Sequence, residues 1–259
     1  MGHIRLGRLP RTRKWRQVVE LLDQDASVGR VAGAAAAAAE SALHSAHDDP
    51  AFTRSFWLLT QIPLAARSAD FAGELVKLGL QTGTKPTLLV VTLAVTRAID
   101  DHVAQLGGRT DLGEMAQLAV VESLATVASR DLPSLFEPTP SDVKLALARL
   151  AAPDRFAALA RDFFARLTRR HLDYYLSREL SKHVGPDRKL SSTDAHTAFN
   201  SALELHAREA SRIVEAFAGG WYSKARFEGR LTPETARRFA WYAFRKIQHE
   251  LKRRQGDDA

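Results

Sequence analysis

The stretch TLLVVTLAVTRAIDDHVAQLGGRTDLGEMAQLAVVESLATVA, residues 87–128, decides the fold of this 259-residue chain. Its two parts, 87–106 and 111–128, carry apolar residues at helical spacing on almost every side, and Gly107-Gly108 interrupt the pattern. A proline before the first part and a threonine before the second are common helix-start residues. Because a helix that is apolar nearly all round is usually buried, we expect both helices in the middle of a bundle.

The rest of the chain repeats the helical pattern between glycine and proline interruptions and lacks the alternating pattern of β-strands. Further helices are expected at 15–22, 31–46, 51–66, 68–80, 141–151, 153–183, 191–218 and 233–254. We therefore predict an all-α fold, a multi-helix bundle of about ten helices with no sheet. Gly219-Gly220 are expected to end the helix before them and to open a loop.

The predicted organisation is a basic N-terminal arm, residues 1–16, followed by a single helical domain, residues 17–259. A softer division within this domain is expected near 131–140, where prolines cluster and the charge of the chain then changes sign. The chain is long enough to bury a core without disulfides, and it has no cysteine. The lack of cysteine excludes thiolate metal ligands and cysteine nucleophiles, and it fits the cytoplasmic localisation that we expect.

The positive charge is unevenly distributed along the chain, whose formal net charge is +7. Residues 1–16 carry six Lys or Arg and no acid, 17–154 carry ten basic and seventeen acidic residues, and 155–259 carry twenty-one basic and thirteen acidic residues. The basic regions suit nucleic acid, anionic lipid or an acidic protein, or they pair with the acidic middle of the same chain. No apolar run approaches the ~20 residues of a membrane span, so a soluble protein is expected.

Aromatic and basic side chains are interleaved near the C-terminus, where 221–254 holds ten basic and three acidic residues. Such a mixture suits a phosphate backbone with bases to stack on, and it equally suits a protein interface. The alternative is that the rings cover neighbouring helices while the cations are only solvated. The candidate binding residues in this segment are Trp221, Tyr222, Lys224, Arg226, Arg238, Trp241 and Arg245.

The N-terminal arm is the second candidate for docking. It alternates apolar and basic residues before Pro10, which favours an extended segment on a surface. An extended basic arm can enter a groove of nucleic acid or add itself to another protein. Its candidate binding residues are Arg5, Arg8, Arg11, Arg13 and Trp15.

Four polar residues form a weak catalytic candidate on the predicted helices 155–183 and 192–218. His171 and Arg178 project onto the apolar face of the first helix, and His206 projects onto that of the second, with Glu209 beside it. If the two faces meet, a histidine pair with a carboxylate can carry out acid–base chemistry. The alternative is a core histidine and a buried arginine–carboxylate pair, since buried polar groups need partners in any fold.

A weak metal candidate lies at a predicted helix end, where His44, His47 and Asp48 are grouped. Histidines three residues apart share one helix face and suit zinc or another divalent ion. The neighbouring Asp49 is explained more simply as a helix cap before Pro50. A histidine at a helix C-terminus also suits the helix dipole without any metal.

The phosphate-loop, dinucleotide-binding, zinc-protease and nucleophile-elbow motifs are absent from the sequence. We therefore expect a non-enzymatic helical interaction or accessory subunit of a larger, bacterial protein assembly, without a cofactor. A protein partner would dock on the basic arm and the basic-aromatic segment. The alternatives are a nucleic-acid-binding protein that uses the same segments and an enzyme built around the histidines. The sequence leaves the oligomeric state open.

Overall fold

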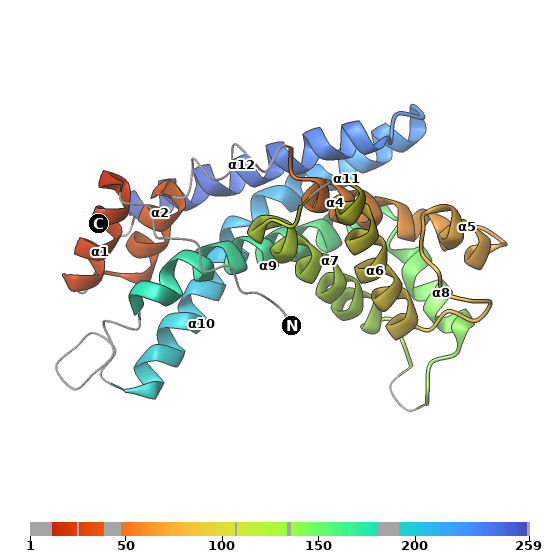
Figure 1. Ribbon diagram of the computed structural model, residues 1–259, viewed down its shortest axis with the longest axis horizontal. Coiled ribbons are helices and arrows are strands. Elements are labelled where there is room, and N and C mark those ends of the chain that lie inside the picture. Colours follow the sequence, from red (N-terminus) through yellow and green to blue (C-terminus); the bar gives the residue numbers. More distant parts are fainter. Residues whose placement is uncertain are drawn as a thin grey trace. The chain divides into compact units, whose positions relative to one another are not determined.

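The computed structural model describes residues 12–24, 26–38, 48–106, 108–133, 136–180 and 192–257. Within these ranges the chain forms eleven α-helices and no β-strand (Figure 1), which confirms the predicted all-α bundle. None of the helices in the described part combines the length and the apolar character needed to cross a bilayer.

Most helices begin close to where local signals predicted. Asp49 caps one helix with Pro50 in its first turn, Thr110 caps another, and Thr139 forms a reciprocal capping box with Asp142. The elements are α1 (Arg13–Asp23), α2 (Val28–Ala38), α4 (Pro50–Ala65), α5 (Phe71–Lys77), α6 (Leu88–Leu106), α7 (Asp111–Ser129), α8 (Pro140–Arg149), α9 (Pro153–Leu180), α10 (Thr193–Ala210), α11 (Arg212–Phe227) and α12 (Pro233–Asp257).

The predicted loop after Gly219-Gly220 was wrong, because both glycines lie inside α11. The helix boundary falls earlier, at Ser211, which separates α10 from α11. Gly219 is required by packing rather than by a turn: a Cβ atom there would lie 2.5 Å from the backbone oxygen of Pro153. Lys224 and Arg226 are therefore presented by a helix.

The chain divides into two compact units. The first comprises Met1–Ser45, Ala165–Ile213 and Phe244–Ala259, and the second comprises Ala46–Phe164 and Val214–Ala243. Three of the boundaries fall inside α9, α11 and α12, where helical periodicity gives no sign of a division. The segment between α7 and α8 lies within the second unit, and the softer division expected there stays a prediction.

The second unit is built around α4, which packs against α5, α6, α7 and α8. No residue of α4 is exposed, whereas α6 and α7 each carry exposed leucines, so the expectation that these two form the centre was wrong. α4 can occupy the centre because its one charged side chain, Arg54, donates from Nη2 to the backbone oxygen of Leu78 at 2.5 Å. That hydrogen bond gives a partner to the one charged side chain of a helix that is otherwise uncharged.

An aromatic core joins α11 and α12 to this centre. Phe56 of α4 lies 5.5 Å from Phe239 and 6.2 Å from Trp221, measured between ring centroids. Tyr222 is completely buried, stacks on Phe156 at 3.8 Å, and donates its hydroxyl hydrogen to the backbone oxygen of Thr60 at 2.9 Å. Burial raises the pKa of Tyr222, because the phenolate would lose its water. The hydroxyl therefore remains a protonated donor.

The first unit packs α2 against α1 and α10. Most residues of the alanine-rich α2 are buried. Trp15 of α1 is also buried, with its ring centroid 5.9 Å from that of Tyr175 on α9.

Candidate functional site

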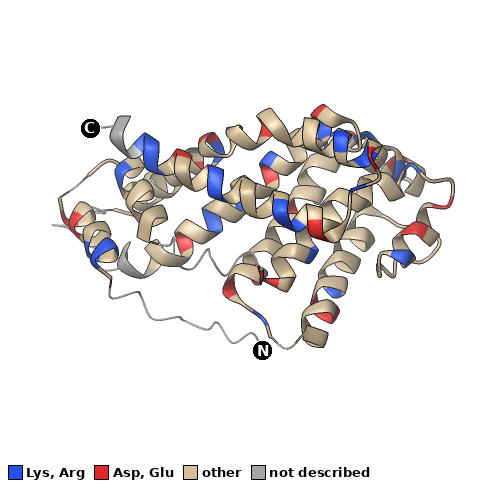
Figure 2. Cartoon of the chain, turned by 90° about the horizontal axis from the view of Figure 1, so that it is seen from above, with Lys and Arg blue, Asp and Glu red and all other residues tan. Residues whose placement is uncertain are grey.

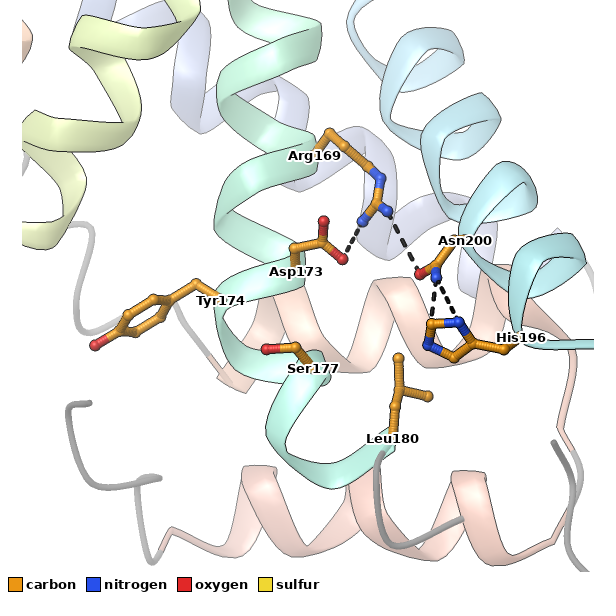
Figure 3. Close-up of a pocket in the computed structure, with 7 residues that line it drawn as sticks. All are labelled: Arg169, Asp173, Tyr174, Ser177, Leu180, His196 and Asn200. Atoms are coloured by element: carbon orange, nitrogen blue, oxygen red, sulfur yellow. Dashed lines mark hydrogen bonds and ion pairs between the residues drawn. The ribbon is translucent and has the colours of Figure 1, made fainter. Parts of the chain in front are cut away.

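A pocket of about 390 Å³ opens between α9 and α10 in the first unit. Figure 3 shows side chains of both helices turned toward each other across it, while Tyr174 points away. The lining residues are Arg169, Asp173, Tyr174, Ser177, Leu180, His196 and Asn200.

Hydrogen bonds already connect most of the polar groups in this pocket. Arg169 pairs with Asp173 one turn along α9, and its Nη2 donates to Oδ1 of Asn200 at 3.4 Å. The Nδ2 atom of Asn200 lies 3.2 Å from Nδ1 and 3.4 Å from Nε2 of His196. A small polar ligand would have to replace these bonds, so the arrangement serves first to bridge the two helices.

His171 lies in the core of the first unit, as the apolar projection predicted. Its side chain is 6% exposed, and its ring meets the edges of Tyr175 at 5.1 Å and Phe244 at 5.8 Å. Burial lowers the pKa of His171 to about 4, because the charged imidazolium would have no water around it. At neutral pH the ring is therefore uncharged, and its Nε2 has no hydrogen-bond partner among the residues that the structure describes.

The described contacts do not assemble the other members of the catalytic candidate around His171. His206 is only half-buried, because the buried face of α10 runs through other positions. Glu209 accepts a hydrogen bond from Arg212 at 3.0 Å. Within the described ranges no hydrogen bond, ion pair or ring contact joins His171 to His206 or Glu209. The side chain of Arg178 lies outside the described residues.

The metal candidate is described only at Asp48, since His44 and His47 lie outside the described residues. Asp48 is exposed and accepts a hydrogen bond from Nη1 of Arg237 at 3.3 Å. Asp49 is buried and caps α4, as the sequence predicted. Across the part of the chain that the structure describes, no group of three or more His, Asp or Glu side chains is suited to a metal ion.

The candidate docking residues divide into core and surface residues. In the N-terminal arm Trp15 is buried and Arg13 is exposed, whereas Arg5, Arg8 and Arg11 lie outside the described residues. In the C-terminal segment Tyr222 is a core residue, so its ring cannot contact a partner. In the same segment Trp221 and Trp241 are half-buried. The exposed residues are Lys224, Arg226, Arg238 and Arg245.

A row of aromatic rings connects α11 and α12 at their outer side. Trp221 stacks on Phe239 with centroids 4.0 Å apart, and Phe217 lies 5.5 Å from Phe239 and 5.6 Å from Tyr242. Tyr242 is 48% exposed, and Phe217 and Trp221 are half-buried. We call this surface the α11–α12 face and define it by Phe217, Trp221, Lys224, Arg238 and Tyr242.

Much of the positive charge near this face is compensated locally. Figure 2 shows Lys and Arg residues interspersed with Asp and Glu residues along the described helices. Glu234 accepts hydrogen bonds from Arg237 and Arg238, which lower its pKa to about 2. Lys224 differs from these arginines, since it is exposed and makes no ion pair or hydrogen bond with any side chain that the structure describes.

The sequence analysis missed a set of exposed leucines in the second unit. Leu89 is 68% exposed and Leu93 49% exposed on α6, and Leu118 is 44% exposed on α7. The available signal was the spacing of Leu89 and Leu93, four residues apart and therefore on one helix face. That signal was hidden because both helices looked buried all round. Phe217, Arg169 and Asn200 were missed for a similar reason, since each lies at the border of a buried face.

No protein-family model, curated protein or solved structure matches the chain. Helical bundles carry many unrelated functions, so fold class alone does not choose among them. The surfaces and the pocket of the described helices are therefore the features from which function can be inferred.

Proposed function

We propose that the protein is a non-enzymatic interaction subunit that docks a protein partner on the α11–α12 face. The observation that carries this proposal is the row of rings formed by Trp221, Phe239, Phe217 and Tyr242, part of which is open to solvent. The partner is an acidic protein segment with apolar anchor residues. An enzymatic role has less support, because the histidines of the catalytic candidate have no described contact with one another.

The chemistry of the face supports a protein partner. Tryptophan, tyrosine and arginine are the residues that most often dominate binding energy at protein interfaces. Aromatic side chains with few rotatable bonds lose little conformational entropy on binding, and these rings are already held by Phe56 and Phe239 of the core. A preorganised aromatic surface is therefore suited to anchoring apolar side chains of a partner.

The charge near the face supports an acidic partner. Residues 221–243 carry five basic and two acidic side chains. Because Glu234 engages two of the arginines, fewer cations remain for a phosphate backbone than the sequence count suggests. Lys224 can contribute an attractive contact with a carboxylate of the partner. Nucleic acid is consequently an alternative outcome of the test below.

A photoreactive amino acid placed at Gly220 tests this proposal. Gly220 is exposed, a Cβ atom added there would have no neighbouring atom within 4 Å, and the residue lies between Phe217 and Lys224 at helical spacing. The control carries the same photoreactive residue at Leu145, which is 58% exposed on α8. Both proteins are irradiated in a lysate of the source cells, and covalent adducts are identified by mass spectrometry.

We expect position 220 to give a defined protein adduct that position 145 does not give. The adduct should disappear when Lys224→Glu and Tyr242→Glu are added, while the circular dichroism spectrum stays unchanged. Equal adduct patterns from 220 and 145 would overturn the proposal. A nuclease-sensitive adduct, with binding of labelled RNA or DNA that weakens steeply with salt, would establish the nucleic-acid alternative instead.

A further inference from the structure

Exposed leucines lie on both α6 and α7, two helices that pack against each other. Leu89 and Leu93 lie one turn apart on α6. Gln117 of α7 donates from Nε2 to the backbone oxygen of Thr96 at 2.9 Å, which fixes how the two helices lie against each other. Leu118 follows Gln117 on α7 and Leu93 lies three residues before Thr96 on α6, so this hydrogen bond puts the two leucines at similar levels along the helix pair. Single exposed leucines are ordinary, but a grouped set on adjacent helices is typical of an interaction surface.

Acidic side chains accompany these leucines on α6 and α7. Residues 88–129 carry five acidic and two basic side chains. Asp101 and Glu114 are exposed and have no ion-pair partner in the described part of the chain. Arg97 is also exposed there, whereas Asp100 is engaged by Arg109 at 2.7 Å. We call the surface the α6–α7 strip and define it by Leu89, Leu93, Asp101, Glu114 and Leu118.

We propose that the α6–α7 strip of one copy of this protein binds the α11–α12 face of a second copy. The proposal rests on the proposed function, and it names the partner of the α11–α12 face. The strip offers leucines bordered by carboxylates, and the face offers rings bordered by cations, so the two surfaces are complementary in polarity and in charge. A basic partner fits the strip better than a second strip, because two acidic surfaces repel.

Both surfaces belong to the second unit, but different helices carry them. Figure 1 shows α11 and the start of α12 on one side of α4, and α6 and α7 on the other. Each copy can therefore give one surface and receive the other at the same time. An interface between two different surfaces is heterologous, and it leads to a ring or an open chain of subunits. Salt should weaken this association by screening the charges that border it.

Sedimentation velocity across a range of protein concentrations, about 1 to 200 µM, measures the association. We expect the sedimentation coefficient of the unmodified protein to rise with concentration and to fall again in high salt. The strip variant Leu93→Glu with Leu118→Glu and the face variant Lys224→Glu with Tyr242→Glu should each remain monomeric alone. Leu145→Glu, which adds a charge at an exposed leucine outside both surfaces, should associate like the unmodified protein.

An equimolar mixture of the two variants distinguishes a heterologous interface from a symmetric one. The strip variant keeps an intact face and the face variant keeps an intact strip, so the mixture should form a heterodimer and nothing larger. A mixture that stays monomeric overturns the proposal, because the two surfaces then do not bind each other. Unmodified protein that stays monomeric at every concentration also overturns it.

The crosslinking at position 220 separates failure of this inference from failure of the proposed function. An adduct between position 220 and a different protein, together with monomeric sedimentation, leaves the proposed function standing and removes self-association. Monomeric sedimentation together with no specific adduct at 220 removes both. Circular dichroism and thermal unfolding of each variant establish that a loss of association is not a loss of folding.

Discussion

The α6–α7 and α11–α12 helix pairs of the second unit show how similar packing produces different surfaces. Both pairs are anchored by a buried glycine: Gly113 of α7 lies against α4, and Gly219 of α11 lies against the start of α9. Both also bury one polar group that donates to a backbone oxygen of a neighbouring helix, Gln117 in the first pair and Tyr222 in the second. Their outer sides differ, since one carries leucines with carboxylates and the other carries rings with cations. The two pairs are thus packed by the same kinds of buried residue, and they differ in their exposed side chains.

The largest effect on stability should come from Gly219→Ala. Comparing it with Gly113→Ala tests whether the two buried glycines are equally important for packing. A Cβ atom at 219 would lie 2.5 Å from the Pro153 backbone oxygen, and a backbone cannot move as a side chain can. At Gly113 the nearest atom would be the Cβ of Ala51 at 2.7 Å. We expect Gly219→Ala to lower the free energy of unfolding by about 3 kcal/mol or more and Gly113→Ala by about 2 kcal/mol. Urea denaturation measures both, and equal losses would contradict the difference.

The next effect is on pH dependence and concerns His171, a buried histidine of α9 in the first unit. The pKa of His171 is lowered from 6.5 to about 4, so the unfolded chain binds a proton more readily than the folded one. Stability is therefore full above about pH 6.5 and falls as the pH drops toward 4, by about 3 kcal/mol in total.

Urea denaturation at pH 7 and pH 4 checks this prediction by comparing the unmodified protein with His171→Leu. The substitution should remove most of the pH dependence in this window. His249→Leu, at an exposed position on α12, is the matched control and should leave it in place. An unchanged pH dependence in His171→Leu would show that other groups cause it.

Smaller losses should follow from removing the polar groups that each pair buries. Tyr222→Phe removes one neutral hydrogen bond to the Thr60 backbone oxygen and should cost about 1 kcal/mol. Gln117→Met removes two hydrogen bonds, one of them to the Asp100 carboxylate at 2.8 Å, and should cost about 2 kcal/mol. Thermal unfolding followed by calorimetry measures both losses of stability. A larger loss in Tyr222→Phe than in Gln117→Met would contradict the prediction.

Gly220→Ala should change stability by no more than Tyr222→Phe does, and in the opposite direction. Gly220 is exposed within α11, and nothing lies within 4 Å of an added Cβ. Alanine is favoured over glycine inside a helix by about 1 kcal/mol, so the variant should gain about that amount. The melting temperature measures the gain. A loss comparable to that of Gly219→Ala would mean that neither glycine is free of packing contacts.

Local sequence signals predicted most helix starts and failed where distant contacts decide. Asp49 and Thr110 cap their helices as expected, because capping depends on residues three positions away. Gly219 looked like a helix stop, although its role depends on Pro153, sixty-six positions earlier in the chain. The central position of α4 was not predicted, because only the folded chain brings Arg54 to the backbone oxygen of Leu78.

The candidate sites were predictable to a lesser degree. The helical projection placed both histidines on buried faces. His171 is buried, as predicted, whereas His206 is half-buried because the exposed side of α10 begins beside it. Trp221 and Tyr222 are adjacent aromatic residues that sequence cannot separate, and the fold buries one ring completely and leaves the other partly open. The α6–α7 strip escaped prediction because apolar residues on every side of a helix usually indicate burial.

Crosslinking between isotopically distinct copies tests the central claim most directly. Unlabelled protein with the photoreactive residue at position 220 is mixed with ¹⁵N-labelled protein, irradiated, digested and analysed by mass spectrometry. The account predicts that position 220 becomes joined to a labelled peptide from residues 88–129 of the second copy. Adducts confined to peptides of the same copy, or to labelled peptides outside α6 and α7, would contradict it.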